Sequence, residues 1–297
     1  MIRLPSPGAW LRQQVRNEVQ RFFGEGQERI DLDTPIGDPG LFGPSSMAWR
    51  VHADLASMMA GGTAALLLQM LHPAALAGIW DHSRFREDRT GRLRRTAQFI
   101  AGTTYGATSE AERLIARVRA VHSRVSGTLP DGSAYRADDP ALLCWVHVAE
   151  SYSFLRAYRR YRAPWLLSAD EDRYYGEVAI IAERLGARDV PVTRQSVSRY
   201  LEAMRRALCA DERTREVARV LLSPGTTGPA ALAAGAMTGA AIDLLPRWAA
   251  RMHGLDPGLE RHGARLALAG IGVVLRRSLT EGSAQRARRR IGGATHT

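Results

Sequence analysis

The chain has 297 residues, of which 45% are hydrophobic, and a formal net charge of +11. This length and apolar content suffice for one large core, and no Pro-, Gly- or Ser-rich linker divides the chain, so we predict one principal domain. Two cysteines, Cys144 and Cys209, exclude a disulfide scaffold and a cysteine-rich metal site. The lack of a phosphate-binding glycine loop and of a nucleophile elbow excludes kinases, dinucleotide oxidoreductases and serine hydrolases.

Residues 1–40 are predicted to form an N-terminal amphipathic arm. The segment from Trp10 to Phe23 is too charged for a signal peptide, and its apolar residues recur at helical spacing. We therefore expect the mature protein to begin near Met1. The scarcity of cysteine fits a reducing compartment, so we expect a cytoplasmic location.

The run from Leu55 to Trp80 is long and apolar enough to cross a bilayer. Pro73 interrupts it late, glycines split its beginning, and His72 would be costly in lipid. A buried central helix that ends or kinks at His72-Pro73 is therefore preferred over a transmembrane span. Peripheral membrane contact stays open as an alternative.

Two helices are predicted next, over residues 92–105 and 110–126. A capping box formed by Ser109 and Glu112 is predicted to begin the second helix. One stripe at the helical period runs along that helix and contains Leu114, Val118, Val121, His122 and Val125. The stripe predicts that His122 points toward the core.

His122 has two interpretations on spacing alone. A lone histidine on an apolar face is more often a core residue held by hydrogen bonds than a metal ligand. A neutral imidazole is nevertheless the commonest metal-binding side chain, and apolar surroundings keep it neutral. The arginines that begin the preceding helix suit an anionic haem, whose iron a histidine holds and whose propionates an arginine binds.

The remainder of the chain is predicted to be helical except for a small hairpin around residues 127–135, where Pro130-Asp131-Gly132 makes a turn. Periodicity and capping signals mark helices over residues 140–161, 169–185, 193–209 and 228–245. The predicted fold class is therefore all-α.

Residues 276–297 are predicted to be a basic C-terminal tail, with six arginines and one acidic residue, Glu281. Such a segment suits nucleic acid or anionic lipid, but this one lacks interleaved aromatic residues and a recognition motif. We expect a solvated, frayed terminus and no nucleic-acid binding.

Six motifs, in order along about residues 40 to 255, resemble those of the MpaB/rubber oxygenase family, which includes latex clearing protein. They are Leu71-His72-Pro73, Asp81-His82-Ser83-Arg84-Phe85, residues 91–96, residues 121–127, Tyr135-Arg136-Ala137-Asp138-Asp139-Pro140 and Trp145-Val146-His147. Agreement of six ordered motifs is more specific than any single one. The resemblance identifies residues 41–275 as an oxygenase-like helical domain.

The resemblance implies a single globin-like helical domain, with extra helices, that holds a b-type haem. It implies that the protein oxidises an apolar molecule, isoprenoid or otherwise alkene-containing, with dioxygen. It also implies that His122 is the iron ligand, that Arg92 and Thr96 lie on the distal side of the haem, and that Arg95 lies beside them. His147 is expected to line the cofactor pocket, although a structural hydrogen bond explains that residue equally well.

Two positions depart from the family pattern. Arg95 stands where the resemblance places an iron-ligating lysine, and a guanidinium has no lone pair to offer iron. Leu76 stands where the rubber-cleaving members have a glutamate base, and an aliphatic side chain cannot transfer a proton. The sixth iron position is then open, water-bound or held by another histidine, of which His82 is the best candidate. His82 and Asp81 are also the nearest candidates for proton transfer.

Two principal hypotheses follow. The first is a haem b-dependent oxygenase with His122 on the iron and with Arg92, Arg95, Thr96 and His82 as catalytic residues. The second is a haem-binding carrier or sensor without oxygenase activity, and a metal-free helical scaffold is a weaker third. Oxygen consumption with a lipophilic alkene separates the first two, and an absorption spectrum tests haem binding itself.

Overall fold

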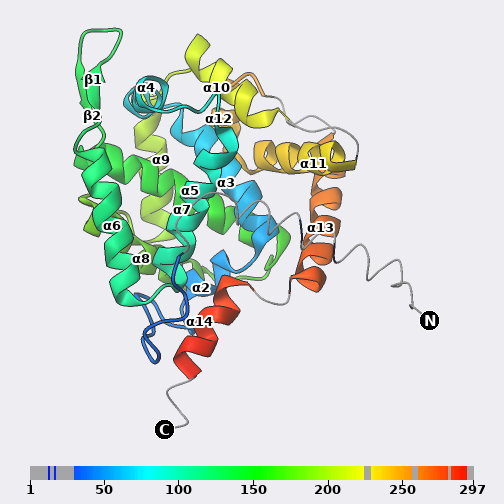
Figure 1. Ribbon diagram of the computed structural model, residues 1–297. Helices are drawn as coiled ribbons and strands as arrows, with labels where there is room; N and C mark the ends of the chain where they lie inside the picture. The colour runs from blue at the N-terminus through cyan, green and yellow to red at the C-terminus, as the bar shows by residue number, and fades with distance from the viewer. Residues whose placement is uncertain are drawn as a thin grey trace.

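The computed structural model describes residues 13, 17, 30–223, 229–255, 260–279 and 282–292. Helices make up 71% of this part of the chain, and a small antiparallel hairpin projects at one end (Figure 1). The all-α prediction is confirmed. Most of the expected N-terminal arm lies outside the described residues, and residues 30–40 of it form turns without regular structure.

The elements occur in the following order: α2 (Met47–His52), α3 (Leu55–Gln69), α4 (Pro73–His82), α5 (Arg89–Tyr105), α6 (Thr108–His122), β1 (Ser126–Thr128), β2 (Ala134–Arg136), α7 (Pro140–Tyr161), α8 (Ser168–Leu185), α9 (Arg194–Met204), the 3-10 turn η1 (Arg205–Ala207), α10 (Glu212–Leu222), α11 (Pro229–Leu244), α12 (Arg247–Met252), α13 (Glu260–Ser278) and α14 (Ser283–Gly292).

The centre of the fold is the packing of α3 against α7. Trp145 of α7 is completely buried, and its indole N–H donates to the Gln69 carbonyl of α3 at 3.2 Å. Small residues on α3 let the two backbones approach closely. A β-carbon at Gly61 would lie 3.0 Å from the Ser153 carbonyl oxygen of α7. The close approach therefore depends on this glycine.

Replacing Gly61 by alanine is expected to lower the free energy of unfolding by about 1–3 kcal/mol, because the new methyl group meets backbone atoms that cannot move aside. Gly62→Ala is the matched control, since its β-carbon would meet Phe154 at 3.6 Å, an ordinary contact. The control should be neutral or stabilising by up to about 1 kcal/mol. Urea unfolding of both variants checks the difference, and equal stabilities would contradict it.

The apolar run from Leu55 to Trp80 is broken where the sequence indicated. The His72 side chain caps α4 by accepting from the Ala74 amide at 3.2 Å, and Pro73 begins that helix. The resulting bend between α3 and α4 is 104°. Among the described residues, no single helix is long and apolar enough to span a membrane. The bent pair of α3 and α4 reaches that length and apolar content only when the two helices are counted together. The prediction of a buried helix ending at His72-Pro73 is confirmed.

The helix α6 begins and ends earlier than predicted, and the expected capping box is wrong. Its N-cap residue, Ala107, makes no side-chain cap. The first amide is instead satisfied by a distant loop, because Thr108 donates its N–H and its hydroxyl to the Asp38 carboxylate, both at 3.0 Å. At the other end the Val125 carbonyl accepts from the Ala137 amide at 2.9 Å, so the chain leaves the helix to join the hairpin.

The helix α9 is also shorter than the predicted 193–209 segment. It is followed by η1 and then by an extended stretch in which the Cys209 amide donates to the Leu71 carbonyl at 2.9 Å. That hydrogen bond ties the segment to the turn between α3 and α4. A tertiary contact therefore ends the helical pattern before the sequence periodicity does.

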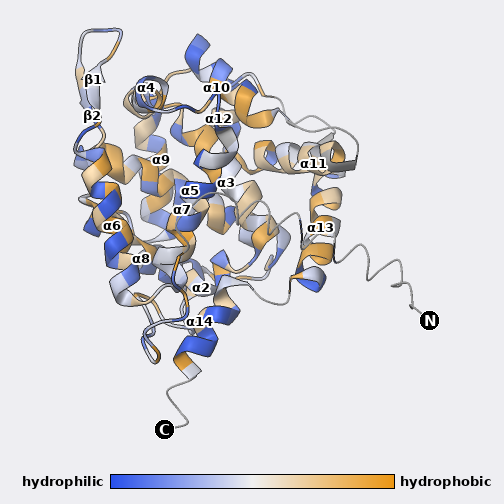
Figure 2. Cartoon of the chain, in the orientation of Figure 1, coloured by the Kyte–Doolittle hydropathy of each residue, from blue (hydrophilic) through white to orange (hydrophobic). Residues whose placement is uncertain are grey.

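The helix α14 replaces the expected frayed terminus over residues 283–292. It is rich in hydrophilic side chains (Figure 2), yet its Arg290 is only 2% exposed. The Arg290 guanidinium donates to the carbonyls of Leu32, Asp38 and Tyr105 at 2.9–3.0 Å. Three backbone acceptors thus hold Nε and Nη1 of this buried cation, while Nη2 has no partner among the described residues. The segment is therefore part of the folded structure. Residues 293–297 lie outside the described residues.

Candidate functional site

The site residues from the sequence are arranged by the antiparallel pair α5 and α6. Only Gly106 and Ala107 separate the two helices. Arg92 precedes the end of α5 by 13 residues and His122 follows the start of α6 by 14, so both lie about 20 Å from the connecting turn. Arg92 and His122 therefore both lie toward the ends of the two helices that are remote from the connecting turn.

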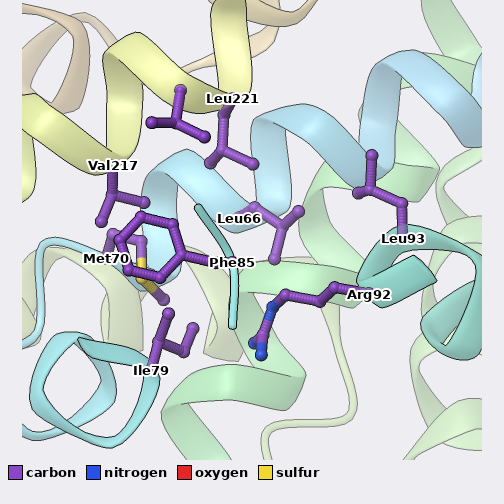
Figure 3. Close-up of a pocket in the computed structure, with 9 residues that line it drawn as sticks. Leu66, Met70, Ile79, Phe85, Arg92, Leu93, Val217 and Leu221 are labelled. Carbon is purple, nitrogen blue, oxygen red and sulfur yellow. The ribbon is translucent and has the colours of Figure 1, made fainter. Parts of the chain in front are cut away.

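The Arg92 side chain enters a pocket whose other walls are apolar (Figure 3). This pocket lies where α3, α4, α5 and α10 meet. It is lined by Leu66, Met70, Ile79, Phe85, Arg92, Leu93, Val217, Val220 and Leu221. Figure 3 shows the guanidinium extending from α5 toward Leu66 and Ile79.

No carboxylate compensates the charge of Arg92 within the described residues. Its guanidinium donates to the Ser83 hydroxyl at 3.0 Å and is otherwise surrounded by apolar walls. Burial lowers the pKa of Arg92, and the nearby positive charge of Arg95 lowers it further. An arginine nevertheless stays protonated in a protein. A partly buried cation held by one neutral hydroxyl is costly in the free protein and is suited to an anionic ligand.

His122 is the last residue of α6 and is half-buried. Burial lowers its pKa, and the carboxylate of Asp138 opposes that shift. The ring is therefore neutral near pH 7. Its Nδ1 is buried and has no hydrogen-bond partner among the described residues. The inward face of α6 differs from the predicted stripe, since Val121 is 55% exposed whereas Ile115 is buried.

Arg95 and Thr96 lie on the exposed side of α5. Arg95 pairs with Asp88, the N-cap residue of α5, at 3.2 Å and keeps about half of its side chain exposed, 51%. The Thr96 hydroxyl donates to the Arg92 carbonyl one turn earlier at 3.2 Å. The Arg92 side chain thus points inward, whereas those of Arg95 and Thr96 do not. The expected roles of Arg95 and Thr96 at a cofactor stay predictions.

His82 is held by the hairpin. Its Nε2 is 3.1 Å from the Ser126 carbonyl oxygen, and its ring lies 6.5 Å from that of Tyr135, centroid to centroid. The neighbouring Asp81 accepts from the Tyr135 hydroxyl at 2.9 Å. Both candidates for proton transfer therefore have partners that fasten the end of α4 to the hairpin.

A second group of polar side chains lies deeper in the fold. His52 of α2 bonds the Thr104 hydroxyl through Nδ1 at 2.8 Å and the Tyr174 hydroxyl through Nε2 at 3.0 Å. Burial lowers the pKa of His52 to about 3, and the nearby His147 contributes to that shift. The structure therefore places His147 near His52.

His147 has no hydrogen-bond partner among the described residues, so the structural hydrogen bond weighed from the sequence is not found there. Burial lowers its pKa to about 4, and the imidazole is neutral. Sequence reasoning did not select His52, Tyr174 or Glu150 as site residues. The one sequence signal for Glu150 is its spacing, since it follows His147 by three residues on the same helix face.

These features define a class of protein: an all-α fold with an uncompensated cation in an apolar pocket and neutral imidazoles between its helices. The chain belongs to the family described as ER-bound oxygenase mpaB/B'/Rubber oxygenase, catalytic domain, which matches residues 49–277. The MpaB/rubber oxygenase prediction is thereby confirmed. No curated protein and no solved structure gives a significant match. The chain is therefore an oxygenase catalytic domain and, in broad terms, an oxidoreductase.

Proposed function

We propose that the chain is a haem b-dependent oxygenase that acts on an apolar, alkene-containing small molecule. Membership of the family supports the oxygenase class. What we propose beyond the family is the cofactor and the substrate class. The observation that supports both is the environment of Arg92. A protonated guanidinium in an apolar pocket, with a single hydroxyl as its partner, fits a site that is completed by an anion.

The donor set suits haem better than a metal ion bound by side chains alone. The described residues contain no group of three or more His, Cys, Asp or Glu side chains arranged to hold a metal. Haem needs one protein ligand, because the porphyrin itself supplies four nitrogens. His122 offers a neutral imidazole at the same end of the α5–α6 pair as Arg92, and its orphaned Nδ1 is a further polar group that no described residue satisfies.

Haem, when bound, supplies the iron that binds and activates dioxygen. His122 would hold that iron, and its lowered pKa keeps the ring nitrogen unprotonated for this task. Arg92 would bind a propionate or a developing anionic oxygen by charge-assisted hydrogen bonds. The apolar walls around Arg92 exclude water and suit a lipophilic substrate. Arg95 and Thr96 are proposed to act beside Arg92, and His147 to line the cofactor pocket, as the family resemblance implies.

Arg92→Leu is expected to have opposite effects on the two forms of the protein. It removes a charge-assisted contact of about 1.5–3 kcal/mol, so haem transfer to a scavenger globin should become roughly tenfold faster or more. The haem-free protein should gain about 1 kcal/mol or more, because a buried unpaired charge is replaced by an apolar group. Arg119→Leu, on the exposed side of α6, is the control and should change neither quantity.

Haem transfer at the wild-type rate in Arg92→Leu would contradict the assignment of Arg92 to a cofactor anion. Arg95→Leu tests the neighbouring position in the same assay. The function itself is tested by dioxygen consumption with a lipophilic alkene. A haem-loaded protein that consumes none with any such substrate would be a carrier or sensor instead.

A further inference from the structure

An open groove lies where α9, η1 and α12 meet, on elements that carry neither Arg92 nor His122. Arginine is the prevailing charged residue of its lining. Arg199, Arg205 and Arg206 come from α9 and η1, and Arg251 comes from α12. Glu202 is the one acidic side chain in the lining, and Trp248 contributes an aromatic ring. The fold thus gathers basic side chains from separate helices into one hollow.

The charges of this groove do not balance. Glu202 pairs with Arg205, whose guanidinium also lies 5.7 Å from the centre of the Trp248 ring. Arg199, Arg206 and Arg251 have no acidic partner among the residues that the structure describes. The groove therefore carries three positive charges that no described carboxylate compensates.

A different arrangement occurs where arginines meet in the interior. Arg160 and Arg265 approach one another from α7 and α13, and both bind the carboxylate of Asp243 between them. A shared acid removes the repulsion between two guanidinium groups. The groove of α9, η1 and α12 lacks such an acid for three of its arginines. It is thus suited to an anion from outside the described chain.

The residue types of the groove indicate which anion it suits. A cleft lined by charges of one sign concentrates counter-ions from solution. Guanidinium groups bind phosphate through paired hydrogen bonds, and a phosphate has enough oxygens to accept from several of them at once. Trp248 is half-buried and offers an apolar surface beside these donors. A phosphate ester combines the charged and the apolar part that such a groove can hold.

We propose that this groove binds a phosphate ester, whose phosphate is held by Arg199, Arg206 and Arg251 and whose organic part lies against Trp248. The phosphate belongs either to the headgroup of a membrane lipid or to a soluble ester, and the experiments below distinguish these sources. The proposal is independent of haem and of the oxygenase reaction.

A local role for the arginines is the competing explanation. Arg251 lies in the last turn of α12, where a cation stabilises the free carbonyls of a helix end. Arg199 lies inside α9 and has no such explanation. A local role changes the stability of the protein by itself, whereas a binding site changes its response to phosphate.

Calorimetric titration of the full chain with inorganic phosphate, against chloride at equal ionic strength, tests the site. The wild type should bind phosphate, and Arg199→Gln, Arg206→Gln and Arg251→Gln should each weaken binding by roughly tenfold. Arg188→Gln, at an exposed position between α8 and α9, is the control and should bind as the wild type does. Glu202→Gln should tighten binding, because it removes the carboxylate that competes for Arg205.

Urea unfolding of the same variants without phosphate separates the two explanations. The three groove variants should unfold at the wild-type midpoint. Lower stability together with an unchanged phosphate affinity would overturn the proposal in favour of the local role. A wild type that binds neither phosphate, phenyl phosphate nor anionic vesicles would overturn it as well.

The organic part and the source of the phosphate are tested with two further probes. Phenyl phosphate should bind more tightly than inorganic phosphate, and Trp248→Leu should remove that difference. If a lipid is the source, the wild type should sediment with vesicles of phosphatidylcholine and phosphatidylglycerol but not with pure phosphatidylcholine, and Arg206→Gln should sediment less. Phosphate binding without sedimentation assigns the site to a soluble ester. Sedimentation that is equal in the wild type and all three groove variants overturns the proposal, as does a preference for duplex DNA over every other probe.

Discussion

His122→Ala is expected to abolish the Soret absorption of protein expressed with haem. Apart from His147, the other described histidines of the core are engaged through ring nitrogens. His52 bonds two hydroxyls, His72 caps α4, and His253 bonds the Leu67 carbonyl at 2.8 Å. His122 combines a neutral ring, an unpartnered buried nitrogen and a place at the same end as Arg92. Iron has no better-placed imidazole at that end.

His147→Ala is the matched control for this result, because His147, like His122, is a half-buried histidine without a hydrogen-bond partner among the described residues. It should keep the Soret band, although the band position will shift if the ring lines the cofactor pocket. The measurement is the ratio of haem to protein after purification. If haem were retained in His122→Ala and lost in His147→Ala, the iron ligand would be His147 of α7 and not His122.

Asp243→Ala is expected to lower the free energy of unfolding by about 3 kcal/mol, the lower end of the range for a broken buried ion pair. The Asp243 side chain is 3% exposed and binds Arg160 of α7 at 2.7 Å and Arg265 of α13 at 2.6 Å. Its removal leaves two cations without their shared anion where α7, α11 and α13 meet. Each arginine keeps about a third of its surface exposed, which limits the loss.

Glu202→Ala is the control for this stability effect. Glu202 pairs with Arg205, but its side chain is 66% exposed, so the loss should stay within about 1 kcal/mol. Urea unfolding at pH 7 provides both values. Similar losses in the two variants would show that burial does not strengthen the Asp243 cluster.

Local sequence signals predicted those elements whose ends are determined locally. The helix α7 has the predicted bounds because Asp139 caps it and Pro140 begins it. The break at His72-Pro73 and the hairpin after α6 likewise follow from turn and capping residues. Ends determined by distant partners were missed, as at α6, where Asp38 from a loop about 70 residues earlier satisfies the first amide.

The same distinction applies to the site. Motif order correctly identified the family. It also selected Arg92 and His122, whose roles stay predictions. Arg95 was grouped with Arg92 because the family resemblance places an iron-ligating lysine at its position, but in the structure Arg95 pairs with Asp88 on the exposed side of α5. The Thr104–His52–Tyr174 chain joins three helices and has no signature in any one of them.

The anchoring of Arg290 has a consequence for the order in which the protein is completed on the ribosome. This arginine joins the Tyr105 carbonyl, at the end of α5, to the loop that contains Leu32 and Asp38. Because α14 is translated after every other described element, the helix that carries Arg92 lacks its final anchor until synthesis is nearly finished. A nascent chain can therefore form the α3–α7 centre early, while the α5–α6 pair matures only with the last helix.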